Sequence, residues 1–276
     1  MRSEELSPSV AQVKEFWETH PLSGAESPFP IGSPKFFDWH DEIRRNDVES
    51  FALHMYEFDQ HRGELVLDVG CGTGWLCQHF AENGARISGV DITSTGVHLT
   101  RARLAMHQLS GDIIQASAEQ LPFATNTYSF VSCAGVLHHT PDMVGAIAEI
   151  HRVLSPAGRA MISLYYRNWL MSERMWPLTR FFVRRLFARL PDRSKFGTVQ
   201  TVDDFVRIYD GNNNPLGKAF DDDSVRELFK DFVIEDREVH YFPRRFLPFP
   251  GLVPRWLHHL LDVCAGTMVY VTVRKA

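Results

Sequence analysis

Three glycines, Gly70, Gly72 and Gly74, occupy alternate positions directly after an apolar run and directly before a helical pattern. A glycine-rich turn between a strand and the start of a helix presents backbone N–H groups and lets a ligand approach the chain closely. The spacing is not that of a phosphate-binding loop, since the GxxxxGK[ST] pattern is absent. It is also not that of a dinucleotide site, because Trp75 occupies the position where a third glycine or alanine would pack beside a pyrophosphate.

Two acidic residues indicate what the glycine loop binds instead. Asp68 lies two residues before Gly70, where a carboxylate is unfavourable beside a pyrophosphate but suits a ligand with an ammonium group. Asp91 ends the next apolar run, 17 residues after Gly74, where a carboxylate can accept both hydroxyls of a ribose. An amino acid joined to a ribose is the outline of S-adenosylmethionine.

Histidines and tyrosines supply the candidates for catalysis. His138 and His139 follow the fourth apolar run and Tyr165 and Tyr166 end the fifth, at the sheet edge where open α/β folds bind ligands. His139 or His138 is a candidate general base or acceptor-orienting group, and Tyr166 a candidate orienting phenol. The alternative is structural, with both imidazoles bonded to backbone carbonyls and both tyrosines packed at the rim. A metal site with Asp142 is disfavoured because adjacent histidines rarely converge on one ion, so we predict no metal.

The elements that must position these residues form an alternating pattern. Short apolar runs with strand character alternate with helical patterns, which indicates βαβ units and a parallel sheet. Turn residues 156–158 separate the fourth helical pattern from the fifth strand, and a capping box from Ser224 to Glu227 opens a late helix. We predict an α/β fold: a doubly wound, mostly parallel, seven-stranded Rossmann-like sheet. The predicted parts are an N-terminal helical cap (1–60), a cofactor-binding core (61–166 and 223–276) and an insertion (167–222) that shapes the acceptor pocket.

Two segments outside the alternating pattern are basic and aromatic. Residues 167–207 contain nine Lys or Arg against four Asp or Glu, and FFVRRLFARL within them has the pattern of an amphipathic basic helix. A second segment, FPRRFLPFPGLVPRWLHHLLDV, lies between the last two predicted strands. We favour a lid over an apolar acceptor; ordinary packing of one helix face and contact with an anionic membrane surface are the alternatives. The N-terminal aromatic residues either roof the site or only pack on the sheet.

Composition excludes several classes of protein. The 276 residues carry a net charge of -5, without the basic excess of a nucleic-acid-binding domain. The four cysteines form no CxxC pair, which argues against a disulfide framework and a zinc site. No run reaches the roughly 18 apolar residues of a membrane span, and nothing at the N-terminus has the pattern of an export signal, so we expect a cytoplasmic protein. The oligomeric state is not readable.

Five motifs in order resemble the class I S-adenosylmethionine-dependent methyltransferases, particularly the small-molecule branch with LPF and LHH signatures. They are ELVLDVGCGTG, GVDIT, SAEQLPF (117–123), GVLHHTPD (135–142) and EIHRVLSPAGR (149–159). The resemblance implies S-adenosylmethionine as cofactor and S-adenosylhomocysteine as product. It also implies these cofactor-binding residues: Arg44, Asp68, Gly70, Cys71, Gly72, Gly74, Asp91, Ile92, Ser117, Ala118, Glu119 and Ala134.

The resemblance also suggests which part of the cofactor each group of residues meets. Asp68 and the glycine loop line the methionine half, Asp91 the ribose, and Ile92 and residues 117–119 the adenine. Ser117 stands where the family typically has Asp, which weakens the expected adenine contact. Arg44 could pair with the methionine carboxylate, the alternative being a solvated helix charge.

The function implied by the resemblance is methyl transfer to a small, fairly apolar organic acceptor in biosynthesis. Three alternatives stay open: a lipid or prenylated acceptor at a membrane surface, a non-catalytic cofactor-binding protein of the same fold, and an NAD-linked oxidoreductase. Trp75 argues against the last of these. A nucleic-acid methyltransferase is disfavoured because the chain is acidic and has no NPP[YFW] tetrad after the fourth strand.

Overall fold

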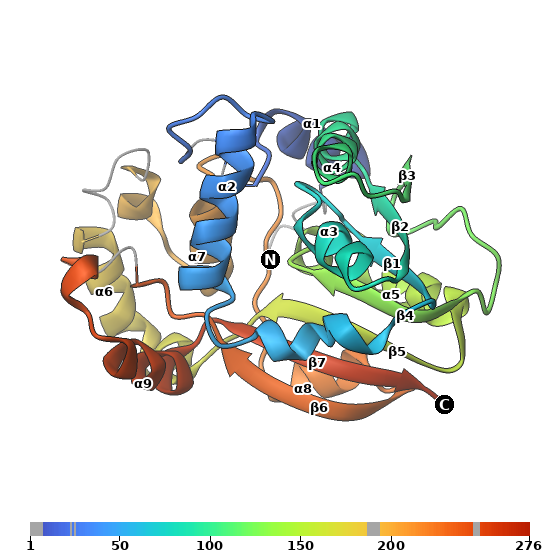
Figure 1. Ribbon diagram of the computed structural model, residues 1–276. Coiled ribbons are helices and arrows are strands. Elements are labelled where there is room, and N and C mark those ends of the chain that lie inside the picture. Colours follow the sequence, from blue (N-terminus) through green and yellow to red (C-terminus); the bar gives the residue numbers. More distant parts are fainter. Residues whose placement is uncertain (1–7, 23, 25, 187–193, 245–248) are drawn as a thin grey trace.

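The computed structural model describes residues 8–22, 24, 26–186, 194–244 and 249–276. A seven-stranded sheet has the order β3-β2-β1-β4-β5-β7-β6 (Figure 1). The strands are β1 (Leu65–Val69), β2 (Arg86–Asp91), β3 (Asp112–Gln115), β4 (Tyr128–Ala134), β5 (Leu154–Tyr165), β6 (Phe232–His240) and β7 (Met268–Lys275). The first five run parallel, and β7 pairs antiparallel with both β5 and β6. The predicted sheet is confirmed.

Helices cover both faces of this sheet (Figure 1). One hydrophobic cluster joins α3 (Trp75–Glu82) and α4 (Ser94–Met106) to side chains of β1 such as Val66. The other joins α5 (Met143–Val153) and α8 (Asp222–Leu228) to the opposite face, where Leu67 points. Successive strand residues therefore face different clusters, which explains why the central strands read as continuous apolar runs.

The N-terminal sixty residues hold α1 (Val10–Thr19), α2 (Pro34–Ile43), the π-helical turn η1 (Arg44–Val48) and two 3₁₀ turns, η2 (Leu53–Tyr56) and η3 (Phe58–Gln60). Between β5 and α8 lie η5 (Trp169–Met171), α6 (Trp176–Leu186), η7 (Ser194–Thr198) and α7 (Val202–Asp210). The turn η9 (Pro250–Leu252) and α9 (Arg255–Ala265) connect β6 to β7. Across the described ranges, each helix is too short or too polar to cross a membrane.

Two local predictions were wrong. The helix expected to begin with a capping box at Ser224 begins at Asp222, because the carboxylate of Asp221 caps it by accepting from the N–H (2.9 Å) and hydroxyl (2.6 Å) of Ser224. Residues 156–158 do not precede the fifth strand but lie within β5, where the register with β4 shifts and Ala157 has a φ of 59°. The predicted basic helix FFVRRLFARL is helical to residue 186, and its remainder lies outside the described residues.

Candidate active site

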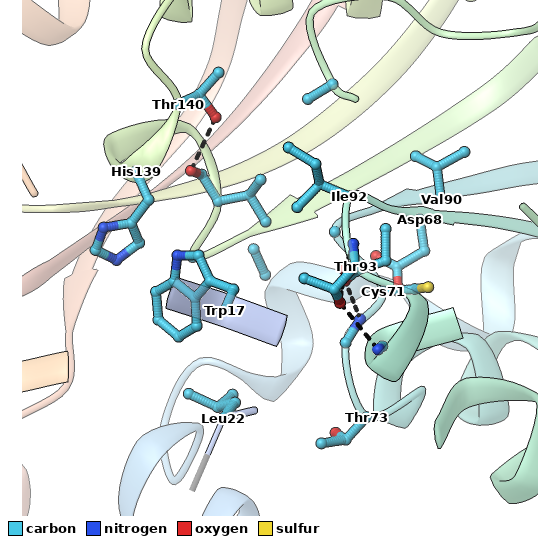
Figure 2. A pocket seen from close by; sticks show the side chains of 18 of the residues that line it. Trp17, Leu22, Asp68, Cys71, Thr73, Val90, Ile92, Thr93, His139 and Thr140 are labelled. Carbon is cyan, nitrogen blue, oxygen red and sulfur yellow. Dashed lines mark hydrogen bonds between the residues drawn. The ribbon is translucent and has the colours of Figure 1, made fainter. Parts of the chain in front are cut away.

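A cavity opens at the carboxyl ends of β1, β2 and β4, beneath α1 of the N-terminal region. It encloses about 1140 Å³, its open mouth included, which is ample for a nucleoside-sized ligand. Figure 2 shows Trp17 and His139 on one side of this space and Asp68, Cys71, Ile92 and Thr93 on the other. Eleven of the twelve predicted cofactor-binding residues line it: Arg44, Asp68, Gly70, Cys71, Gly72, Asp91, Ile92, Ser117, Ala118, Glu119 and Ala134.

The glycines of the loop serve different purposes. Gly70 has a φ of 75°, and a Cβ there would lie 2.2 Å from Cγ2 of Val136. Gly74, the one predicted residue that does not line the cavity, precedes α3 with a φ of 77°. A Cβ on Gly74 would lie 2.8 Å from Cα of Thr100 in α4. Gly74 thus allows close helix packing, while Gly70 and Gly72 border the ligand space.

Asp91 is held in one orientation by its neighbours. Its Oδ2 accepts from the N–H of Gly72 (2.9 Å), and its Oδ1 accepts from the N–H (2.9 Å) and hydroxyl (2.6 Å) of Thr93. Burial raises the pKa of Asp91 despite these hydrogen bonds. A preorganised acceptor at the end of β2 fits a ribose diol.

Asp68 is a buried carboxylate near the end of β1, just before the glycine loop. Its Oδ1 accepts from the hydroxyl of Ser132 (2.7 Å), and its Oδ2 lies 3.4 Å from Sγ of Cys77. Burial raises its pKa to about 6, against the opposing effect of these two donors. Such a carboxylate favours a cation beside it, which fits the ammonium group of a methionine moiety.

Arg44 is not the solvated helix charge that was the alternative, because it is buried in a polar network. Its Nη2 donates to Oε1 of Glu49 (2.6 Å), and its guanidinium lies 4.5 Å from the ring centroid of Trp75. Glu49 also accepts from the hydroxyls of Tyr56 (2.8 Å) and Tyr270 (2.9 Å). The Nε of Arg44 is buried without a hydrogen-bond partner, although the residue borders the cavity. An unused cationic donor at this position fits a ligand carboxylate.

The segment expected to meet adenine is internally braced. The hydroxyl of Ser117 accepts from the N–H of Glu119 (3.2 Å), and Oε1 of Glu119 accepts from the N–H of Asp142 (2.9 Å). This contact ties the segment after β3 to the start of α5. Glu119 thereby fixes the part of the cavity wall where adenine is expected.

His139 is the predicted catalytic residue that lines the cavity. Its Nδ1 lies 2.5 Å from the carbonyl oxygen of Leu216, and its Nε2 lies 3.0 Å from Oδ2 of Asp210. The other oxygen of Asp210 accepts from the hydroxyl of Tyr165 (2.8 Å). The ring of Trp17 in α1 packs 5.1 Å from the His139 ring, measured between centroids. Both imidazole nitrogens of His139 are therefore engaged by acceptors.

The two other catalytic candidates lie elsewhere. His138 is buried outside the cavity lining, its ring packs 4.6 Å from that of Tyr165, and burial lowers its pKa well below the usual value. Tyr166 does not line the cavity either; its ring packs against Arg237 and borders a separate hollow. The carboxylate of Asp142 caps α5 by accepting from the N–H of Gly145 (2.9 Å), so it does not form a site with the histidines.

Sequence reasoning missed Asp210, which follows no motif and meets His139 only through the fold. His138, His139 and Asp210 offer potential ligand atoms within 4.8 Å of one another. These three residues lie close together because His139 contacts Asp210 directly, and we assign no metal ion to them. Glu49 was missed for the same reason, since no local spacing marks it.

Comparisons with known proteins agree with this geometry. Residues 67–162 match the sequence model of a methyltransferase domain family. A ubiquinone biosynthesis O-methyltransferase of Pseudomonas paraeruginosa is 33% identical over 107 residues, 38% of this chain and 46% of that protein. The protein of the same name from Acinetobacter baylyi is 29% identical over 147 residues, 51% of this chain and 61% of that protein. The chain thus spans about half the length of the curated relatives it matches.

Two solved structures share the fold over nearly the whole chain. Magnesium protoporphyrin IX methyltransferase from Synechocystis, solved with S-adenosylhomocysteine bound, gives a TM-score of 0.60 at 14% identity, covering 97% of this chain and 100% of that one. The [4+2]-cyclase SpnF gives a TM-score of 0.59 at 19% identity, covering 98% of this chain and 97% of that one. Residues 67–162 are therefore a methyltransferase domain. The sheet order and the two solved structures show that the chain has the fold of the class I S-adenosylmethionine-dependent methyltransferases.

Proposed function

We propose that this protein transfers the methyl group of S-adenosylmethionine to a hydroxyl oxygen of a small, fairly apolar organic acceptor and releases S-adenosylhomocysteine. The cavity carries this proposal, because its lining combines charged side chains, such as Arg44 and Asp91, with apolar ones, such as Trp17, Leu22 and Val136. Relatives named as O-methyltransferases support oxygen as the methylated atom. When bound, the cofactor supplies an electrophilic methyl carbon on a sulfonium.

Three charged groups would hold the cofactor. Arg44 would bind the methionine carboxylate, Asp68 would face the ammonium group, and Asp91 would accept from the ribose hydroxyls. Each of these side chains is already fixed by neighbouring protein groups. The protein therefore pays little additional ordering entropy when the cofactor binds.

The acceptor would lie against Val13, Trp17, Leu22, Val136 and His139, which also line the cavity. Methyl transfer is an in-line displacement, so the protein must hold the nucleophile, the methyl carbon and the sulfur collinear and close together. A wall of apolar side chains around His139 would orient an apolar acceptor and exclude water from the reacting centre.

We propose that the ring of His139 packs against the acceptor and orients it, rather than removing a proton from the acceptor hydroxyl. Its Nδ1 faces the Leu216 carbonyl at a distance that requires an N–H, and its Nε2 faces the Asp210 carboxylate. A base role would require Nε2 to be released from Asp210. Asp210 is then a positioning residue that acts through His139.

The test has two stages. Calorimetry with S-adenosylhomocysteine measures cofactor binding, and release of S-adenosylhomocysteine from S-adenosylmethionine is then followed with a panel of small phenols, thiols and amines. We expect product with phenols. Binding without turnover of any acceptor class would favour the non-catalytic alternative, which the fold shared with a cyclase keeps open. Turnover only with acceptors in lipid vesicles would favour the lipid alternative.

The pH profile separates the two roles of His139. An orienting role predicts that His139→Gln lowers kcat/KM for the acceptor about tenfold and leaves the shape of the pH profile unchanged. A general base would cost roughly 100-fold or more and remove the acidic limb of the profile. Asp210→Asn should lower kcat/KM for the acceptor by a factor similar to that of His139→Gln. Asp223→Asn, an exposed substitution on α8, serves as the control.

A further inference from the structure

Two helices outside the cofactor-binding sheet turn apolar side chains toward solvent. On α6 the exposed positions include Leu178, Phe181 and Phe182, each at least half exposed, while Val183 is buried. On α9 the exposed positions include Trp256, Leu260 and Val263, at 69%, 51% and 58%. An ordinary surface helix buries its apolar stripe and exposes its polar face.

The departure from this ordinary arrangement is clearest on α9, whose inward face is partly polar. His258 and Asp262 are buried there, one turn apart. Asp262 accepts from Nδ1 of His240 (2.6 Å), and Nε2 of His258 lies 2.9 Å from the carbonyl oxygen of Phe242. These bonds fix the helix with its apolar side outward.

Both α6 and α9 contact the same short turn, η5. The hydroxyl of Thr179 in α6 donates to the carbonyl of Leu170 (2.7 Å), and the indole N–H of Trp169 donates to the carbonyl of Cys264 in α9 (2.8 Å). Trp169 is itself 56% exposed. Figure 1 places both helices at one end of the molecule, away from β1, β2 and β3. We name the residues Leu178, Phe181, Phe182, Trp256, Leu260 and Val263 the α6–α9 face.

The charge around this face is positive although the whole chain is acidic. The sequence of α6 contains Arg180, Arg184 and Arg185 and no acidic residue. Arg180 and Arg184 donate to backbone carbonyls at 3.2 and 2.8 Å, and neither forms an ion pair with the residues that the structure describes. On α9, Arg255 precedes Trp256, and the acidic residue of that helix is the buried Asp262.

We propose that the α6–α9 face docks on a membrane surface that contains anionic lipid. Exposed Trp, Phe and Leu beside arginines match the pattern of helices that lie in the headgroup region, with apolar side chains in the acyl boundary and cations at the phosphates. Pairing of this face with a second copy would bring like-charged arginines together, which disfavours it. The proposal goes beyond the methyl transfer proposed above and does not depend on it.

Vesicle flotation tests the proposal without cofactor or acceptor. The intact protein is mixed with phosphatidylcholine vesicles, with or without phosphatidylglycerol. We expect it to float with the phosphatidylglycerol vesicles at low salt, to bind neutral vesicles weakly, and to dissociate as salt rises. Absence of flotation with phosphatidylglycerol vesicles at low salt would overturn the proposal.

Matched variants locate the contact. Phe181→Ser with Phe182→Ser, and separately Trp256→Ser with Leu260→Ser, should each lower the partition coefficient at least tenfold, and Arg185→Gln about fivefold. The controls Val144→Ser and Arg226→Gln change exposed side chains on α5 and α8 and should leave binding unchanged. Thermal unfolding and S-adenosylhomocysteine affinity report that each variant is folded. Unchanged flotation of the apolar variants, or a wild-type dimer that these variants convert to monomer, would contradict membrane docking by this face.

Discussion

At the scale of single residues, three of the charged side chains that line the cavity each have protein partners before a ligand arrives. Asp91 is bound by Gly72 and Thr93, Asp68 by Ser132, and Arg44 by Glu49. Burial makes each charge costly unless it is paired, so a zwitterionic ligand that meets Arg44 and Asp68 together is favoured over one of a single sign. The donor's amino acid end has this character.

The ribose assignment rests on Asp91. Asp91→Ala should weaken S-adenosylhomocysteine binding by roughly 2 to 4 kcal/mol, because it removes two charge-assisted hydrogen bonds. Asp91→Asn, which keeps one acceptor oxygen, should lose less. Calorimetry measures both, with Asp223→Ala as an exposed control. Equal affinities for wild type and Asp91→Ala would show that the ribose binds elsewhere.

The pKa of Asp68 predicts how cofactor affinity depends on pH. Burial raises this pKa to about 6, so the carboxylate is mostly ionised at pH 7 and mostly protonated at pH 5. The ammonium group favours the ionised form, and S-adenosylhomocysteine affinity should therefore fall about tenfold from pH 7 to pH 5. The free energy of unfolding of the ligand-free protein changes in the opposite direction. Because the pKa of Asp68 is higher in the folded protein than in the unfolded chain, protonation of Asp68 stabilises the fold as the pH falls below about 6.

The matched variant for this prediction is Asp68→Asn. It should bind S-adenosylhomocysteine more weakly at pH 7 and lose the Asp68 contribution to the pH dependence. A wild-type affinity that stays constant from pH 7 to pH 5 would mean that Asp68 does not face the ammonium group.

At the scale of elements, α1 is fastened to the start of α4 by one side chain. Glu18 accepts from the N–H groups of Ser94 (3.0 Å) and Thr95 (2.8 Å) and from their hydroxyls (2.6 and 2.7 Å). These groups lie at the positive end of the α4 dipole. Burial raises the pKa of Glu18, but the four hydrogen bonds outweigh this effect and lower the pKa to about 2. The same helix carries Val13 and Trp17 into the cavity wall.

Glu18→Ala should therefore speed ligand dissociation. Loss of these hydrogen bonds frees α1 from α4, and we expect the dissociation rate of S-adenosylhomocysteine to rise about tenfold in stopped-flow measurements. Amide hydrogen exchange within α1 should rise as well. Glu15→Ala, an exposed change on the same helix, is the control. A dissociation rate equal to that of the wild type would show that α1 does not retain the ligand.

At the scale of the whole molecule, the sequence predicted what depends on local spacing. The strands were predicted from apolar runs. The cofactor-binding residues between 68 and 119 were predicted from the glycine loop, a strand end and a short segment, which lie close together in the chain. His139 and Asp210 are 71 residues apart, and no periodicity indicates that they meet. Neither Tyr165 nor Tyr166 lines the cavity. Strand alternation says that the two side chains point to opposite faces of the sheet, but not which of them approaches His139. The fold decides, and Tyr165 contacts Asp210.

The boundaries proposed for the cap and the insertion, 1–60 and 167–222, stay predictions. In the described part of the insertion, Asp210 at the end of α7 and the carbonyl of Leu216 in the loop after it both contact the imidazole of His139. The cavity lining includes no described residue of α6. We therefore propose that the insertion shapes the acceptor side through α7, while α6 serves a surface role.

The cavity joins α1, η1 and the ends of three strands, so ligand binding should stabilise the molecule as a unit. A ligand at 100 times its dissociation constant adds about 2.7 kcal/mol to the free energy of unfolding. For a chain of this size that corresponds to a rise in Tm of about 5 °C. Differential scanning fluorimetry with S-adenosylhomocysteine should show this rise, and Asp91→Ala should reduce it at the same ligand concentration. NAD should produce no shift in Tm, because Trp75 occupies the position where a dinucleotide site needs glycine or alanine. A shift with NAD and none with S-adenosylhomocysteine would reverse the cofactor assignment.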